Sequence, residues 1–306
     1  MPILESNLSG LKLKNPVMTA SGTFGYGKEY SEFFSLDKLG AVVVKGIAPF
    51  ESHGNPTPRI AEVSSGMLNA IGLQGPGIDK FLNGRDYMPF LRTTGATVIV
   101  NIWGKTLDDY VETARRLEEE SEGIAALEIN ISCPNVKEGG ASFGTDINLA
   151  SEVVSKIREV TSLPLITKLS PNIAAITEFA KAVVDSGSDI VSLINTIPSM
   201  AIDIKTRKPK IANISGGLSG PAIKPIALKM VYDTARAVSV PIIGMGGIFT
   251  AEDAIEFFIA GASAIAVGTA IFTDPYAPLK IIEGIEAYLD QAGIKEISEL
   301  IGTLQV

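Results

Sequence analysis

The feature that most constrains the fold of this chain is a repeat in which short apolar runs alternate with longer amphipathic segments. Short apolar runs predict buried strands, and the longer segments have the apolar spacing of helices. Parallel strands joined by crossover helices produce this alternation. Eight strand candidates occupy residues 16–20, 41–44, 97–102, 126–131, 165–169, 190–194, 242–244 and 264–267, and the clearest helix candidates occupy 107–122, 148–160, 173–186, 222–237, 251–259 and 278–291.

Eight such repeats predict an α/β fold of the (β/α)8 TIM barrel type, with residues 1–306 forming a single domain. A doubly wound open sheet is the alternative, and it requires that some of the predicted strands are false. The first residues predict an antiparallel ribbon, 3–6 against 11–14 about a turn at 8–10, that caps the barrel floor. Two connections, 46–75 and 195–221, are longer than a strand-to-helix loop requires, so we expect them on the active, C-terminal face.

Composition argues against several classes of protein. A chain of 306 residues with 46% hydrophobic residues can bury a large core, and its formal net charge of -8 argues against nucleic-acid binding. A single cysteine cannot form an internal disulfide, and the sequence has neither a signal-peptide pattern nor an apolar run of membrane-spanning length. These features predict a cytoplasmic protein with no nucleic-acid partner, no membrane partner and no metal site of its own.

Polar residues follow most of the predicted strands at their C-terminal ends, where barrels place their active sites. Asn and Gly are also ordinary turn formers, so each residue taken singly has a structural explanation. Two lysines inside apolar strands, in VVVKG and LITKLS, are harder to explain structurally, because a buried ammonium group needs an anionic or strongly polar partner. The strand-end candidates are Ser21, Lys45, Gly46, Asn101, Asn130, Ser132, Cys133, Lys168, Asn195 and Thr196.

The last two strands end in glycine-containing turns that suit a phosphate. Residues 244–247 read GMGG, and Gly268-Thr269 follows the next strand. Glycines let backbone N–H groups approach an anion, and a helix beginning near Thr250 adds the positive end of its dipole. Many barrels bind phosphate between the loops after strands seven and eight, so the pair favours a phosphorylated ligand over a simple tight turn.

Cys133 is the only cysteine, at the mouth of the fourth strand in a glycine-rich loop. A lone cysteine is commonly a small buried hydrophobe. Beside a phosphorylated cofactor, lysines and amides, however, its thiol could act as a base in a redox reaction, because a reference pKa of about 8.5 suits proton removal near neutral pH. The residues themselves do not name a substrate.

At these positions the chain resembles class 1 dihydroorotate dehydrogenases, and the B-type catalytic subunit more closely than the A-type. The resemblance extends over nearly the whole chain, and the Asn-x-x-Cys-Pro run after the fourth strand is its most specific part. The matching segments are NPVMTASGTFGYG at 15–27, VVVKG at 42–46, MLNAIGLQGPG at 67–77, NISCPNVKEGG at 130–140, TKLSPN at 167–172 and IGMGGI at 243–248.

The resemblance implies an FMN enzyme that oxidises (S)-dihydroorotate to orotate in pyrimidine biosynthesis. It implies that Cys133 removes the C5 proton while the C6 hydride passes to FMN, that Lys45 lies between flavin and substrate, and that Lys168 stabilises the reduced ring. The implied substrate-binding residues are Lys45, Asn69, Ala70, Ile71, Gly72, Leu73, Asn130, Asn195 and Thr196. The implied cofactor-binding residues are Ser21, Lys45, Gly46, Asn101, Asn130, Lys168, Ile194, Gly220, Gly246, Gly247, Gly268 and Thr269.

The B-type resemblance also implies a partner subunit that carries FAD and a 2Fe-2S cluster and passes electrons to NAD. This chain has no GxGxxG after a strand and no cysteine set for a cluster, which agrees with a separate partner. A homodimer of catalytic chains within a heterotetramer is the implied assembly.

Four alternatives stay open from the sequence. An A-type enzyme would use the same site and reduce fumarate without a partner, and a relative of the barrel in dihydropyrimidine dehydrogenase would act on uracil. A lyase or isomerase would use Lys45 or Lys168 as a Schiff base. A phosphate-binding barrel without activity would leave Cys133 and both lysines unexplained. His53 is expected to be a loop residue and Trp103 a packing residue.

Overall fold

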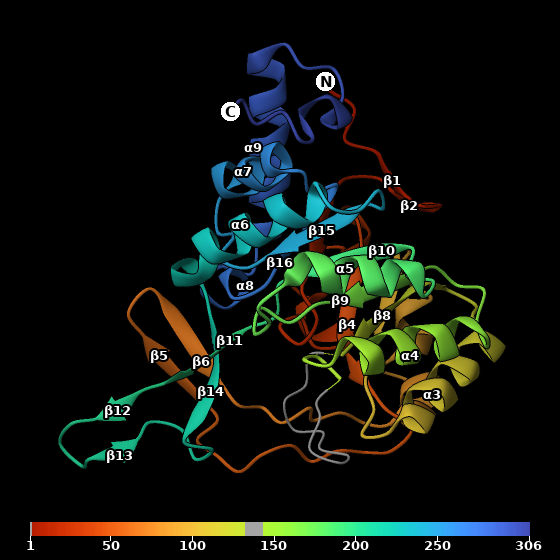
Figure 1. Ribbon diagram of the computed structural model, residues 1–306, viewed down its shortest axis with the longest axis vertical. Helices are drawn as coiled ribbons and strands as arrows, with labels where there is room; N and C mark the ends of the chain where they lie inside the picture. The colour runs from red at the N-terminus through yellow and green to blue at the C-terminus, as the bar shows by residue number, and fades with distance from the viewer. Residues whose placement is uncertain (1, 132–142) are drawn as a thin grey trace.

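A computed structural model describes residues 2–131 and 143–306 and shows a central barrel of eight parallel strands (Figure 1). Neighbouring strands follow the order β3-β16-β15-β10-β9-β8-β7-β4, and a parallel bridge between Met18 and Ala41 joins the two ends of the sheet. The closed sheet confirms the TIM barrel and shows that the doubly wound alternative is wrong. The strands are β3 (Val17–Thr19), β4 (Val42–Ile47), β7 (Val98–Ile102), β8 (Ile124–Asn130), β9 (Leu165–Lys168), β10 (Ile190–Leu193), β15 (Ile242–Met245) and β16 (Ala264–Val267).

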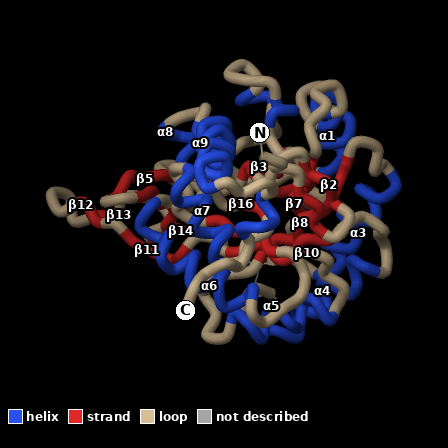
Figure 2. The backbone as a smooth tube through the Cα atoms, turned by 90° about the horizontal axis from the view of Figure 1, so that it is seen from above, coloured by secondary structure: helices blue, strands red, loops and turns tan. Residues whose placement is uncertain are grey.

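Helices surround the strands, as the view in Figure 2 shows. Each predicted helix is present within a few residues of its expected bounds; the segment expected at 222–237 begins with a 3-10 turn before its α-helix. The main helices are α3 (Leu107–Glu119), α4 (Ile147–Arg158), α5 (Ile176–Asp185), α6 (Lys224–Ala235), α7 (Ala251–Ala260) and α9 (Ala277–Ala292). Shorter ones are α1 (Ile78–Asn83), α2 (Met88–Leu91), α8 (Ala270–Thr273), η1 (Lys28–Tyr30), η2 (Leu36–Lys38), η3 (Pro221–Ile223) and η4 (Ile297–Leu300).

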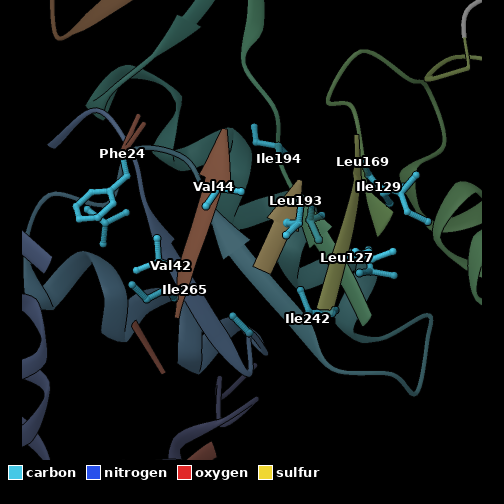
Figure 3. Close-up of a cluster of buried hydrophobic side chains, with 14 of the residues drawn as sticks. Phe24, Val42, Val44, Leu127, Ile129, Leu169, Leu193, Ile194, Ile242 and Ile265 are labelled. Carbon is cyan, nitrogen blue, oxygen red and sulfur yellow. The ribbon is translucent and has the colours of Figure 1, made fainter. Parts of the chain in front are cut away.

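Alternation along the strands sends apolar side chains to both faces of the barrel wall. On β8, Leu127 and Ile129 belong to the outer core beneath the helices, together with Val42, Val44 and other residues drawn in Figure 3. The intervening positions, Ala126, Glu128 and Asn130, face the other side of the same strand. Because side chains alternate between the two faces of the strand, the outer face of β8 is apolar and its inner face becomes polar toward the C-terminal end.

The barrel floor is closed by the ribbon of β1 (Ser6–Leu8) and β2 (Leu11–Leu13). Leu8, Leu11 and Leu13 are buried and pack in one cluster with interior residues of the barrel strands. The floor position is confirmed, but the expected first strand at 3–6 is wrong. The two-residue turn pairs Leu8 with Leu11 and Ser6 with Leu13, which places the strand at 6–8.

The two long connections form strands of their own that the sequence patterns did not reveal. β5 (Ile60–Val63) and β6 (Gly66–Asn69) come from the connection after β4, and β11 (Ile197–Met200) and β14 (Ser215–Ser219) from the one after β10. They build one sheet in the order β11-β14-β6-β5, called the insertion sheet below. The small ribbon of β12 (Ile202–Asp203) and β13 (Lys208–Pro209) lies at its outer tip in Figures 1 and 2.

Candidate active site

A cavity of about 580 Å³ lies at the C-terminal ends of the barrel strands. Its walls include residues at or just after the ends of all eight barrel strands, together with residues of the insertion sheet. This volume is within the range of small-molecule and cofactor sites. The cavity therefore has the position at which barrels of this kind hold their ligands.

The structure brings together every predicted site residue that it describes. Cys133 and Ser132 lie outside the described residues, so the structure gives no position for the thiol. The predicted residues that line the cavity are Ser21, Lys45, Gly46, Asn69, Ala70, Ile71, Gly72, Leu73, Asn101, Asn130, Lys168, Ile194, Asn195, Thr196, Gly220, Gly246, Gly247, Gly268 and Thr269. Their individual roles stay predictions.

Lys168 ends β9, and its side chain is 5% exposed. Its ammonium group donates to Ser21 Oγ at 3.1 Å, which ties it to the loop after β3. Burial restricts the rotamers of this long side chain and excludes water around it. A lysine held in this way can stabilise negative charge on a ligand at a fixed place in the cavity.

Lys45 lies within β4 and is partly buried. Burial, assisted by the positive charge of Arg59, lowers the pKa of Lys45, and Glu29 opposes the shift only in part. Both effects disfavour the ammonium form. An anionic ligand beside Lys45 would relieve this penalty, so the group is suited to bind a carboxylate.

Asparagine side chains of the barrel and of the insertion sheet provide hydrogen-bonding groups on the cavity wall. Asn195 Nδ2 donates to Asn130 Oδ1 at 3.5 Å, and Asn195 Oδ1 accepts from the Thr196 backbone N–H at 2.8 Å. On the insertion sheet, Asn69 Nδ2 donates to the Gly217 carbonyl at 3.5 Å. Amides offer both donors and acceptors, so this wall can bind a planar ring that carries carbonyl and N–H groups.

The loop after β15 approaches two neighbouring segments closely. Gly247 has φ +78°, and a Cβ there would lie 2.7 Å from Lys224 Cβ and 2.9 Å from the Gly220 carbonyl oxygen. Nearby, Thr269 Oγ1 donates to Ser219 Oγ at 2.8 Å, which links the turn after β16 to the insertion sheet. Gly246, Gly247 and Gly268 in this corner line the cavity and carry no side chain, so an anion such as a phosphate could approach their backbone N–H groups.

The helix after this loop begins at Ala251, close to the expected position. Thr250 and Asp253 form a reciprocal capping box, and Asp253 also accepts from the Phe249 backbone N–H at 2.8 Å. Lys224 forms ion pairs with Asp253 and Glu256 at 2.7 and 2.8 Å. These interactions use several donors at the helix start internally, so the glycine turns are the better candidates for contact with an anion.

Sequence reasoning missed part of the cavity wall that the insertions supply. Asn55 and Gln74 line it, with Asn55 Nδ2 donating to the Ala70 carbonyl at 3.0 Å and Gln74 Oε1 accepting from Arg59 at 2.8 Å. No periodicity marks these loop residues. The glycines of SGGLS were a usable signal, since a Cβ at Gly217 would lie 1.9 Å from Thr196 Oγ1. Further missed lining residues include Asn172, Asn213, Ser215, Ser219 and Phe249.

His53 and Trp103 have the positions expected for residues outside the site. His53 lies in a loop and does not line the cavity. Trp103 is 3% exposed and packs edge-on against Phe50, with ring centroids 5.4 Å apart. Its contribution is therefore apolar packing beside the cavity.

Comparisons with known proteins agree with this geometry. The family model described as dihydroorotate dehydrogenase matches residues 3–289. The chain belongs to the dihydroorotate dehydrogenase family, a family of oxidoreductases. It is 57% identical over 303 residues to the dihydroorotate dehydrogenase B (NAD(+)) catalytic subunit of Geotalea uraniireducens, covering 99% of this chain and 98% of the relative.

Two further family members carry the same name. The protein of Alkaliphilus metalliredigens is 55% identical, covering 98% of each chain. That of Geobacter metallireducens is 53% identical, covering 100% of this chain and 99% of the relative. The similarity to this branch of the dihydroorotate dehydrogenase family therefore extends along the whole chain, including both insertions and the floor ribbon.

Within residues 2–131 and 143–306, no helix has the length and apolar character needed to cross a membrane. The same residues contain no group of three or more His, Cys, Asp or Glu side chains placed to hold a metal ion.

Proposed function

We propose that this chain is the catalytic subunit of a B-type dihydroorotate dehydrogenase, which binds FMN and oxidises (S)-dihydroorotate to orotate in pyrimidine biosynthesis. The observation that carries the proposal is one cavity in which two lysines, several asparagine amides and bare glycine turns converge. The names of the relatives at 53–57% identity support the same activity. Residues 1–306 act as a single barrel domain in this proposal.

The residues present fit FMN. The turns at Gly246-Gly247 and Gly268-Thr269 line the cavity on β15 and β16, and the close approach at Gly247 leaves no room for a side chain. They would hold the phosphate through backbone N–H groups. Asn101 and Lys168 line the cavity from β7 and β9, where they would meet polar edges of the ring. When bound, FMN supplies the acceptor for the hydride from substrate C6.

The remaining wall residues would bind the substrate. Asn130, Asn195 and Asn69 offer amide donors and acceptors to the ring of dihydroorotate, and Lys45 offers a cation to its carboxylate. Cys133, which lies outside the described residues, accepts the C5 proton as its thiolate. Loss of that proton and of the C6 hydride leaves the C5–C6 double bond of orotate, so atoms and electrons balance.

The electrons leave through a separate subunit in this proposal. The relatives are named as NAD(+)-linked catalytic subunits, a name that supports a partner. That partner carries FAD and a 2Fe-2S cluster and passes electrons to NAD, and two catalytic chains form the core of a heterotetramer. The A-type alternative, with fumarate as acceptor, is not favoured by the relatives' names.

An anaerobic visible spectrum tests the proposal. The purified chain, reconstituted with FMN in the presence of NAD, is mixed with dihydroorotate. We expect the flavin band to bleach, with no NADH formed until the partner subunit is added. Fumarate should not restore the band.

Other outcomes would contradict separate parts of the proposal. A chain that does not retain FMN would refute the flavin assignment. A band that bleaches with dihydroorotate and recovers with fumarate would identify an A-type enzyme. Bleaching by dihydrouracil in place of dihydroorotate would show that the substrate is wrong.

A further inference from the structure

Beneath the cavity, the barrel interior contains a buried carboxyl group that the proposed reaction does not use. Glu128 lies on β8, is 2% exposed, and is not part of the cavity wall. It is the only Asp or Glu among the buried residues of the described chain. Burying a carboxyl group costs free energy unless hydrogen bonds satisfy it. Glu128 lies two residues before Asn130 on the same strand, so its hydrogen-bond partners indicate what it does there.

Both oxygens of Glu128 accept hydrogen bonds from other strands. Asn101 Nδ2 of β7 donates to Oε2 at 2.7 Å, and Ser192 Oγ of β10 donates to Oε1 at 3.0 Å. The carboxyl group therefore spans the interior from β7 to β10, past the intervening strand β9. Ser192 fixes one oxygen, and the other is presented to Asn101.

The hydrogen bond to Glu128 determines which way the Asn101 amide points. The oxygens of Glu128 act as acceptors, so they select the NH₂ group of Asn101 and leave its carbonyl oxygen on the other side. That oxygen lies beside Gly46 on the cavity wall, where a Cβ on Gly46 would be 2.9 Å from Asn101 Oδ1. Asn101 consequently faces the cavity as a hydrogen-bond acceptor.

We propose that Glu128 is a positioning residue, which orients the Asn101 amide so that its carbonyl oxygen accepts a hydrogen bond from a ring N–H of the bound cofactor. This inference rests on the proposed function for the identity of that cofactor. FMN carries a ring N–H between two carbonyl groups. If the Asn101 amide were turned the other way, its NH₂ group would face that N–H, and two donors cannot form a hydrogen bond. Glu128 acts through Asn101 and does not contact the ligand.

FMN titration of the apoprotein, followed by quenching of flavin fluorescence, tests the proposal. Glu128→Gln keeps the reach of the side chain and an acceptor oxygen while it removes the charge. Glu128→Asp keeps the carboxyl group but is one methylene too short to reach both partners. Glu128→Met removes the acceptor. We expect the Kd for FMN to stay within about threefold in Glu128→Gln and to rise at least about tenfold in Glu128→Asp and Glu128→Met.

A double-mutant cycle separates positioning from a general loss of stability. Asn101→Ala should weaken FMN binding, and adding Glu128→Met to it should weaken binding by no more than about threefold further, because both changes remove the same contact. Ser188→Ala is the matched control. It removes a buried hydroxyl that bonds to Thr167 at 2.7 Å elsewhere in the wall, and should lower the apoprotein unfolding temperature without changing the Kd.

The outcomes distinguish this inference from the proposed function. If the unaltered chain does not bind FMN, the proposed function fails. If it binds FMN and all Glu128 variants bind equally well, only the positioning role is refuted. If Glu128→Met does not fold, the Gln and Asp variants still decide, because a purely electrostatic role predicts weaker binding in Gln and normal binding in Asp.

Discussion

Lys45 and Lys168 both interrupt apolar strands, yet the protein surrounds their ammonium groups differently. Lys168 is 5% exposed and donates to Ser21. For Lys45, burial and Arg59 lower the pKa, and no carboxylate among the described residues forms an ion pair with it. Lys168 is therefore held in place by the chain itself, whereas Lys45 would gain a compensating charge from an anionic ligand.

The lowered pKa of Lys45 predicts how orotate binding depends on pH. In the proposed function, protonated Lys45 would attract the orotate carboxylate, and bound orotate would in turn oppose the lowering of the Lys45 pKa. Affinity should therefore be constant below the pKa of the free protein and should fall as pH rises through it. Orotate titrations followed by the flavin spectrum should show this fall at lower pH than an exposed lysine would give.

Two variants serve as comparison for that measurement. Lys45→Met should bind orotate about tenfold more weakly at neutral pH and lose the alkaline fall. Lys12→Met, on the exposed side of β2, should behave like the unaltered chain. An alkaline fall that persists in Lys45→Met would assign it to another group.

Cys133 is a candidate from sequence alone, and its proposed role as a base has a direct test. Cys133→Ser should retain FMN but lose turnover near neutral pH by at least about 10²-fold. The reason is that a serine hydroxyl is far less acidic than a thiol, so it is much harder to deprotonate. Rapid mixing of the FMN-loaded variant with dihydroorotate measures flavin reduction directly. Full activity in this variant would remove the assignment.

Residues at the strand ends could be predicted because a barrel's topology converts sequence position into spatial position. Lys45, Asn101 and Lys168 each follow a recognisable apolar run, so their convergence follows from the fold. Asn55 and Gln74 could not be found in this way. They reach the cavity through loop conformations that no local pattern encodes.

At the scale of elements, the loop after β15 is held between two helices. Lys224 at the start of α6 pairs with Asp253 and Glu256 of α7, and its Cβ lies where a side chain on Gly247 would go. A side chain at Gly247 would therefore clash with Lys224, which is itself held by its ion pairs to α7. The backbone path of the loop is set by packing as well as by its own sequence.

Gly247→Ala should weaken FMN binding at least about tenfold through this clash and the strain at φ +78°. Gly293→Ala provides a matched control, since Gly293 has φ +71° with nothing within 4 Å of the added Cβ. The control should lose about 1–2 kcal/mol of unfolding free energy and keep its FMN affinity. Equal affinities in the two variants would show that the loop after β15 does not hold the cofactor.

The barrel elements were predictable and the insertion sheet was not. Eight apolar runs and six amphipathic segments carry local periodicity, and all of them form the expected elements. The pairing of β6 with β14 joins Met67 to Ser219 and Asn69 to Gly217, far apart in the sequence, and both strands are short and glycine-containing. Long-range register of this kind leaves no local signal. The first strand of the floor ribbon is shifted for a different, local reason, because the tight turn between Leu8 and Leu11 sets its register.

At the scale of the whole molecule, the barrel closes on itself and is plugged from below. Leu8 and Leu11 of the ribbon pack into the lower interior of the barrel strands. The N-terminal segment also meets the C-terminal region, where Ile3 pairs with Glu296, and Figure 1 shows both termini at the same end. Stability and ligand binding are thus assigned to opposite ends of the barrel.

This separation predicts that Leu11→Ala lowers the free energy of unfolding of the apoprotein by about 2–5 kcal/mol through a cavity in the floor, without changing FMN affinity. Urea denaturation followed by circular dichroism measures the first quantity and fluorescence titration the second. Lys12→Ala, an exposed neighbour on the same strand, should change neither. A large loss of FMN affinity in Leu11→Ala would show that the two ends are coupled.

The insertion sheet joins strands that stand across the barrel from each other, since β4 and β10 are four places apart in the closed order of eight. Neither insertion completes this sheet alone, because β6 must find β14 in one register. The two insertions therefore form one structural unit and have to be exchanged together. A chimera that takes one insertion from a distant relative would break the pairing, whereas an exchange of both together would carry the roof of the cavity over intact.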